Sequence, residues 1–327
     1  MRCLRHCLAI AAAAVCAIAF VAPAHAQPYP SKPIRLVVPF PAGGGTDFFA
    51  RTVGAKMNET LGQTIVVDNR PGGSTIIGAE NVKNAAPDGY TVLLGDLGTY
   101  ALNPSLFKKL PYDPASDFAP VTLTGRFVLT IAVNPSVMNV SSIKELIEMA
   151  KKEPGKINYA SPGTGSPHHL AMELFAKQAG IKLTHVPYKG AAPALQDLVG
   201  GQVGVMMVDI AAGMPHIKGG KIRVLGTATP SPVAALPGVP TIASAGLPGF
   251  EAWAWQGLAV PKGTPPDVVA KLRDGYVKAV DDPAVRSKLV DAGIEPLVST
   301  PEEMASYMSA ETAKWAKVIK EANIKAD

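Results

Sequence analysis

The sequence predicts an α/β protein with two lobes joined by two hinge connections. Short apolar runs alternate with helix-like segments through most of the chain, which is typical of α/β folds. Two glycine-rich loops, Pro39–Asp47 and Ser161–Pro167, each follow a strand-like run and open onto a helix-like one. The chain has 327 residues, which is long enough for two domains that each bury a core.

The N-terminal segment Met1–Ala26 has the features of a secretory signal peptide. Arg2 and Arg5 precede an apolar stretch, Cys7–Val21, and the segment ends in Ala-His-Ala, a small-residue cleavage site. A membrane anchor is the alternative, but the apolar stretch is shorter than the roughly 20 residues that span a bilayer. We expect cleavage before Gln27 and a periplasmic mature protein.

The composition of the remaining chain excludes several kinds of chemistry. All three cysteines lie in the signal segment, so the mature chain has no thiol for disulfide, metal or nucleophile chemistry. Two of the 31 basic residues and none of the 26 acidic residues lie there too, which leaves 29 basic residues and a net charge of +3. Basic runs with interleaved aromatic residues are absent from the sequence, so we expect no nucleic-acid partner, and no cofactor.

Strand-like and helix-like segments follow one another along the chain. The expected strands are Arg35–Val38, Ile65–Asp68, Thr91–Leu94, Ile131–Asn134, Ile157–Ala160, Leu183–Val186, Val203–Val208, Arg223–Ala228 and Ala252–Val260. The expected helices are Asp47–Met57, Ser74–Lys83, Ile143–Lys151 and two that begin at Thr264 and Thr300, each with a cap, an early proline and a first-turn acid. Ser142 and Glu145 have the spacing of a capping box.

The strand at Ala252–Val260 follows a turn-rich break and suggests a crossing between lobes. If the chain leaves the first lobe near Gly125 and returns near Glu251, that lobe is discontinuous. Residues 27–125 and 251–327 then form lobe 1, and residues 126–250 form lobe 2. Two connections of this kind make a hinge, with ligands bound between the lobes.

The two glycine-rich loops are candidate anion cradles. Glycine allows close approach of the backbone to a ligand, and the first turn of a helix leaves its N–H groups unpaired. The first loop lacks the lysine of a nucleotide phosphate loop, and the second lacks the third glycine of a dinucleotide fingerprint. What remains suits a carboxylate, with Thr46 or Asp47 as the helix cap. The alternative is a tight strand-to-helix turn without a ligand.

Side chains near the second loop and after two strands permit several interpretations. Adjacent His168 and His169 diverge on a helix, so we expect no metal site, and His169 either donates to an anion or packs at the helix start. Ser166 would be the nucleophile of a hydrolase, although a G-x-S-x-G elbow is absent from the sequence. Asp96 and Asp209 follow strands and either face the cleft or cap a helix.

The chain resembles the Bug receptors, the solute-binding components of tripartite tricarboxylate transporters, through essentially its whole mature length. The stretches that carry the resemblance are Tyr29–Arg35, Pro39–Arg51, Val67–Gly73, Ala86–Tyr90, Asp117–Val121, Val186–Gly190 and Gly257–Pro265. The resemblance implies a Venus flytrap clamshell similar to type II periplasmic binding proteins. It also implies a monomer without enzymatic activity that captures a small carboxylate and delivers it to membrane transporter subunits.

The resemblance also implies that backbone and hydroxyl groups of the two loops hold one carboxylate, often through bridging water. The expected ligand-binding residues are Phe40, Ala42, Gly43, Gly44, Gly45, Thr46, Asp47, Asp96, Thr99, Ser161, Gly163, Thr164, Gly165, Ser166, His169 and Asp209. The chain departs from the family pattern at Asp96, Gly204 and Ile210. Because two aspartates could receive an ammonium group, an amino-acid receptor or a sensory receptor is an alternative, and a periplasmic serine hydrolase is another.

Overall fold

The computed structural model describes residues 28–326, so the predicted signal peptide lies outside the described residues. Its strands are β1 (Ile34–Val38), β2 (Ile65–Asn69), β3 (Thr91–Asp96), β4 (Phe118–Val133), β5 (Asn158–Ser161), β6 (Thr184–Pro187), β7 (Val205–Asp209), β8 (Arg223–Thr227), β9 (Trp253–Pro261) and β10 (Ile294–Pro296). Its helices are α2 (Gly45–Leu61), α3 (Ile76–Lys83), α4 (Asn103–Leu106), α5 (Ile143–Lys152), α6 (Pro167–Ala179), α7 (Ala191–Val199), α8 (Ile210–Lys218), α9 (Pro266–Val280), α10 (Pro283–Asp291) and α11 (Pro301–Glu321), with one π-helical turn, η1 (Gly98–Leu102). Within residues 28–326, none of the helices has the length and apolar character needed to cross a membrane.

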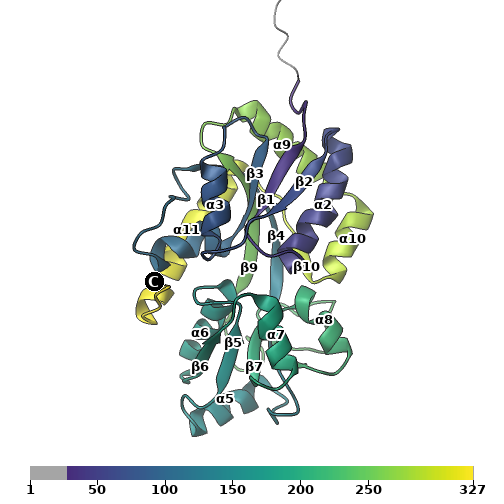
Figure 1. Ribbon diagram of the computed structural model, residues 1–327. Helices are drawn as coiled ribbons and strands as arrows, with labels where there is room; N and C mark the ends of the chain where they lie inside the picture. The colour runs from purple at the N-terminus through teal and green to yellow at the C-terminus, as the bar shows by residue number, and fades with distance from the viewer. Residues whose placement is uncertain (1–27, 327) are drawn as a thin grey trace, which may run out of the picture.

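The molecule has two lobes (Figure 1), and its ten strands form one continuous sheet that passes from one lobe to the other through β4. In the upper lobe, β1 pairs in parallel with β2 and β3, and β9 lies antiparallel between β3 and β4. Helices α2, α9 and α10 cover one face of this sheet, and α3 and α11 cover the other. The α/β fold of two lobes that the sequence predicts is confirmed.

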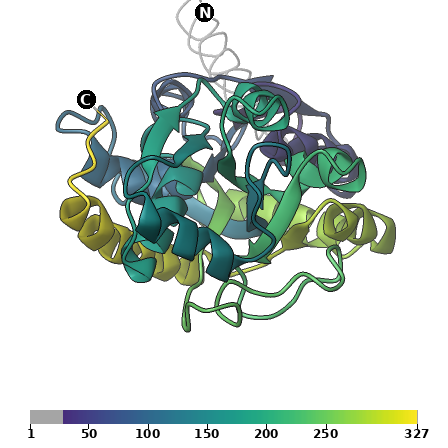
Figure 2. The same cartoon turned by 90° about the horizontal axis from the view of Figure 1, so that it is seen from below.

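In the lower lobe, β5 pairs in parallel with β6 and β7, while β4 lies antiparallel to β7 and β8. Helices α5 and α6 pack on one face of this sheet, and α7 packs on the other against Ala160, Met206 and Val208. The irregular chain between β8 and β9 forms a loop on one side of the molecule (Figure 2).

Strand β4 runs through both lobes. Its residues from Phe118 to Val128 pair with β9, and those from Leu129 to Val133 pair with β7. The predicted strand Ile131–Asn134 covers only the second part of β4, so its predicted length is wrong. The register against β9 shifts twice, and such bulges interrupt the alternation by which a strand is recognised. The lobe boundaries expected near residues 125 and 251 fall inside β4 and just before β9, and they stay a prediction.

The predicted helix caps have mixed outcomes. The predicted cap at Thr300 is confirmed, and it forms a capping box, because the Thr300 hydroxyl accepts from Glu303 N and the Thr300 N–H donates to the Glu303 carboxylate. Ser142 caps α5, but Glu145 accepts from Ser141 instead, so that capping box is incomplete. Thr264 does not cap α9, because the helix begins one residue later than expected and the Thr264 hydroxyl donates to Pro261 O.

Candidate functional site

Both glycine-rich loops lie at the carboxyl ends of parallel strands and face the opposite lobe. The first loop joins β1 to α2, and the second joins β5 to α6. A β-carbon at Gly45 would lie 3.7 Å from Ala211 Cβ of α8, in the lower lobe. A β-carbon at Gly165 would lie 2.5 Å from Leu106 Cδ1 of α4, in the upper lobe. The two loops therefore border the seam between lobes, where open α/β sheets bind ligands.

The first loop leaves the start of α2 without a side-chain cap. The helix begins at Gly45 with Gly44 as its N-cap, so the expectation that Thr46 or Asp47 is the cap is wrong, because both lie inside the first turn. The Asp47 carboxylate instead accepts from Gly43 N at 2.9 Å. Glycine at the N-cap allows a ligand to approach the unpaired N–H groups of this turn.

Asp47 is the internal support of the first loop. In addition to Gly43 N, it accepts from Arg51 Nε and from Asn69 Nδ2, each at 3.0 Å. Burial raises the pKa of Asp47, but the hydrogen bonds from Arg51, Gly43 and Asn69 outweigh burial and lower the pKa below its usual value. The ionised Asp47 therefore ties the loop to α2 and β2.

A buried polar network lies behind the first loop, at the end of β3. Asp96 Oδ1 accepts from both Thr99 N and Thr99 Oγ1 at 2.8 Å, and Thr99 Oγ1 lies 3.0 Å from Thr75 Oγ1. Burial raises the pKa of Asp96, while the Thr99 hydrogen bonds act in the opposite direction. These contacts match the interpretation of Asp96 as a loop hydrogen-bonder, and Thr99 is fully buried beside it.

Thr75 is a residue of this network that the sequence reasoning missed. Thr75 and the preceding Ser74 both have positive φ, 77° and 53°, a conformation that is uncommon outside glycine and concentrates at functional sites. Asn103 Nδ2 donates to Ser74 O at 2.8 Å and holds this turn. The signal in the sequence is a third glycine-containing turn, between β2 and α3.

The second loop is supported from below by stacked side chains. His169 Nδ1 accepts from Gly165 N at 3.0 Å, and its ring stacks on His185 with centroids 3.8 Å apart. Ser161 Oγ lies 2.6 Å from His185 Nε2 and accepts from Gly163 N at 3.1 Å. Burial, together with His185, lowers the pKa of His169 to about 3, and burial lowers that of His185 to about 4. Both rings are therefore neutral near pH 7 and act as packing groups.

Ser166 is the N-cap of α6 and does not pair with a histidine ring. Its hydroxyl accepts from His169 N at 3.3 Å, whereas the His169 ring is bonded to Gly165 N. A hydrolase nucleophile requires a base within hydrogen-bond reach. This geometry does not favour the hydrolase interpretation.

Asp209 lies at the carboxyl end of β7 and contacts His168, a second residue that the sequence reasoning missed as a site candidate. His168 Nε2 lies 3.1 Å from Asp209 Oδ2, and both side chains are largely buried. Asp209 is the N-cap of α8, yet its side chain makes no capping hydrogen bond. Among the described residues, no group of three or more potential ligands could hold a metal ion.

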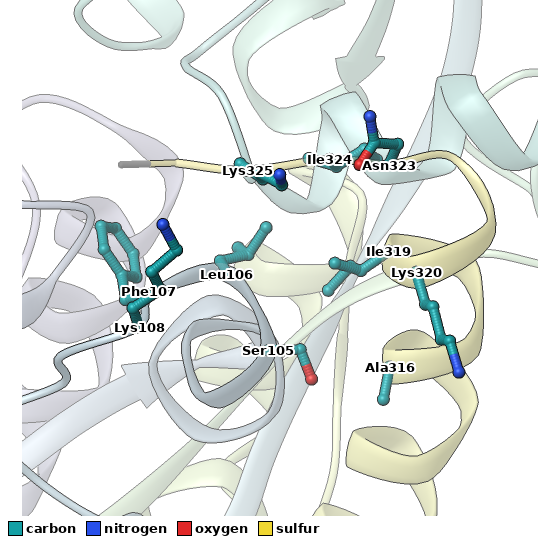
Figure 3. A pocket seen from close by; sticks show the side chains of 10 residues that line it. All are labelled: Ser105, Leu106, Phe107, Lys108, Ala316, Ile319, Lys320, Asn323, Ile324 and Lys325. Atoms are coloured by element: carbon teal, nitrogen blue, oxygen red, sulfur yellow. The ribbon is translucent and has the colours of Figure 1, made fainter.

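A surface groove of about 430 Å³ lies between α4 and the end of α11 (Figure 3). Its wall includes Leu106, which also packs against Gly165. None of the sixteen predicted site residues lines this groove.

The sequence matches one family model and several curated proteins. The model is described as the tripartite tricarboxylate transporter family receptor and matches residues 49–324. A protein encoded in the tcbD–tcbE intergenic region of Pseudomonas sp. strain P51 is 40% identical over 300 residues, covering 91% of this chain and 89% of that protein. BugT of Bordetella pertussis is 34% identical over 319 residues, covering 97% of this chain and 98% of that protein.

Solved structures with the same fold include periplasmic binding proteins. BugD is 36% identical with a TM-score of 0.84, covering 91% of this chain and 99% of that one. A protein from R. palustris, solved with adipate, is 38% identical with a TM-score of 0.86 and the same coverage. MatC from Rhodopseudomonas palustris, solved with bound malate, is 35% identical with a TM-score of 0.81, covering 89% of this chain and all of that one.

Proposed function

Because the chain belongs to the tripartite tricarboxylate transporter receptor family, we propose that it closes its two lobes on a small carboxylate in the periplasm and delivers it to membrane transporter subunits. The observation that carries the proposal is the pair of glycine loops, each of which abuts the opposite lobe at Gly45 and Gly165. A ligand that contacts both loops stabilises the closed arrangement, which membrane subunits can then distinguish from the empty one.

Backbone donors at the start of α2 and hydroxyl groups of the second loop supply the affinity for the carboxylate in this proposal, because Gly163 N, Gly165 N and Ser166 N already donate to protein acceptors. Neither loop contains Lys or Arg, while the helix starts of α2 and α6 favour negative charge. Micromolar binding requires about 8 kcal/mol, and each hydrogen bond to a charged group contributes roughly 1.5–3 kcal/mol. About three to five hydrogen bonds of this strength are therefore enough for micromolar binding.

The predicted site residues divide into two roles. We assign direct ligand contact to Phe40, Ala42–Thr46 and Gly163–Ser166, of which Ala42, Gly43 and Gly44 are exposed and the others are partly or fully buried. Asp47, Ser161 and His169 hold the shape of these loops through the hydrogen bonds described above. Asp96 with Thr99 and Asp209 with His168 border the region that receives the rest of the ligand.

Dicarboxylates are the first ligands to test, because adipate and malate are present in the structures of two relatives. Amino acids are the second class, since Asp96 and Asp209 suit an ammonium group. Thermal unfolding and calorimetric titration with succinate, adipate, L-malate and L-aspartate should give a saturable shift with at least one acid. Mass spectrometry should recover that acid unchanged, and conversion of it, or no shift with any acid, would count against the receptor.

A further inference from the structure

Gln256 is a buried polar residue whose side chain adds no hydrogen bond to the described part of the fold. It lies in the middle of β9 and is fully buried. Neither Oε1 nor Nε2 of its carboxamide has a hydrogen-bond partner within residues 28–326. Burying an unpaired amide destabilises a protein, because the group gives up its water hydrogen bonds without replacement. An apolar residue of the same size would fold better at this position.

The sheet register places Gln256 at the edge of the upper sheet that faces the seam. Gln256 pairs with Asp96, the last residue of β3, on one side and with Gly125 of β4 on the other. Directly opposite residues of an antiparallel pair point to the same face, with β-carbons roughly 4.5–5.5 Å apart. The β-carbons of Gln256 and Asp96 are therefore neighbours.

This face of β9 is also the face beneath the start of α2. Ala254 and Leu258, which alternate with Trp255 and so share the face of Gln256, belong to the same core cluster as Phe127. A β-carbon at Gly45 would lie 3.0 Å from Phe127 Cε1. The uncapped first turn of α2 and the unpartnered carboxamide are thus two independent features of one region.

We propose that Gln256 contacts the ligand and determines its specificity, by binding a hydrogen-bond-donating substituent next to the carboxylate. The proposal rests on the receptor function above. The substituent lies between Gln256 and Asp96, where a second carboxylate is disfavoured because two carboxyl groups at one buried site resist being ionised together. A hydroxyl group can accept from Gln256 Nε2 and donate to Asp96, and an ammonium group can donate to Gln256 Oε1 and to Asp96. Hydroxyl and ammonium are both hydrogen-bond-donating substituents. A dicarboxylate without such a substituent forms a hydrogen bond with neither Gln256 nor Asp96.

Three acids with one carbon skeleton test this proposal. Succinate, L-malate and L-aspartate differ only in whether carbon 2 carries hydrogen, hydroxyl or ammonium. Calorimetric titration of the wild type should give tighter binding of L-malate or of L-aspartate than of succinate, and the tighter of the two identifies the substituent. Gln256→Met, an apolar residue of similar shape, should reduce that preference about tenfold. The same variant should raise the melting temperature of the ligand-free protein.

Leu258→Met is the matched control, since it lies on the same face of β9 and pairs with Leu94, farther from the seam. It should leave the preference unchanged. Gln256→Leu provides a second apolar variant in case methionine packs poorly. An unchanged preference in both Gln256 variants, or a lower melting temperature of both ligand-free variants, would overturn the proposal while the receptor function stands. Absence of binding by the wild type to all three acids and to adipate would instead remove the receptor function, and this proposal with it.

Discussion

Gly165→Ala should weaken ligand binding in addition to weakening folding. Gly165 has φ +77°, and an added β-carbon would lie 2.5 Å from Leu106 Cδ1. Contacts between carbon atoms are optimal at about 3.5–4.0 Å. Because Leu106 is buried in α4 of the upper lobe and Gly165 belongs to the lower lobe, the clash opposes closure of the lobes.

Gly155 provides a control that separates backbone strain from closure. It has the same φ, +77°, and no atom lies within 4 Å of an added β-carbon. Alanine in this conformation costs about 1–2 kcal/mol, so Gly155→Ala and Gly165→Ala should lower the free energy of unfolding by similar amounts. The additional overpacking at Gly165 costs about 1–3 kcal/mol and destabilises the closed arrangement, which corresponds to a loss of affinity of roughly fivefold to 150-fold.

Urea unfolding of the ligand-free variants and calorimetric titration with the tightest acid would measure the two effects separately. A rescue variant sharpens the test, because Leu106→Val removes the δ-carbon that the new β-carbon would meet. The double variant should bind more tightly than Gly165→Ala alone. Equal affinities of Gly155→Ala and Gly165→Ala, or a double variant that binds no better than Gly165→Ala, would refute closure against Leu106.

Three further predictions concern the stability contributed by two buried histidines and by two helix caps. His169 and His185 have pKa values of about 3 and about 4 in the folded protein, below the usual 6.5, so the protein takes up protons when it unfolds. The two neutral rings therefore contribute their full stability above about pH 6.5, and this contribution declines as the pH falls toward about 4 and about 3. Replacing one of them, in His185→Phe, should reduce the decrease in urea midpoint between about pH 7 and about pH 5. Ser166→Ala should lower the free energy of unfolding by about 1 kcal/mol through loss of the helix cap. If Ser166 is a cap and not a nucleophile, the wild type and Ser166→Ala should both release their ligand chemically unchanged. Thr300→Ala should lower the unfolding free energy by about 1 kcal/mol, whereas Thr300→Ser, which keeps the hydroxyl, should change it little.

The strand and helix elements that depend on local sequence were largely predictable. The runs at β1, β2, β3 and β5 are short, apolar and bounded by Gly, Pro or Asn, and a strand followed by glycine and a helix is a local pattern. Helices α7, α8 and α10 and strand β10 did not emerge, because they are short and derive their stability from contacts with segments distant in sequence.

The side-chain arrangement of the candidate site was less predictable than its loops. Asp96 contacts Thr99 because η1 begins two residues after Asp96, the last residue of β3, and a π-helical turn has no clear sequence signal. Gln256 is unremarkable in the sequence, and its importance arises only when β9 pairs with β3 and buries it beside Asp96. Local patterns therefore predict where backbone donors lie, while sheet register determines which side chains accompany them.

Different residues should control the affinity of the receptor and its selectivity among acids. Asp47 holds the first loop through Gly43, and His169 holds the second through Gly165, within single lobes. Loops that are already ordered require little free energy to organise when the ligand arrives, so changes in these supports should weaken all acids alike. Gln256 and Asp96 contact neither loop through a described hydrogen bond and lie where acids differ from one another. Changes there should alter the ranking of acids more than the average affinity, so evolution of new ligand preferences in this receptor is expected at the β3–β9 pair rather than in the glycine loops.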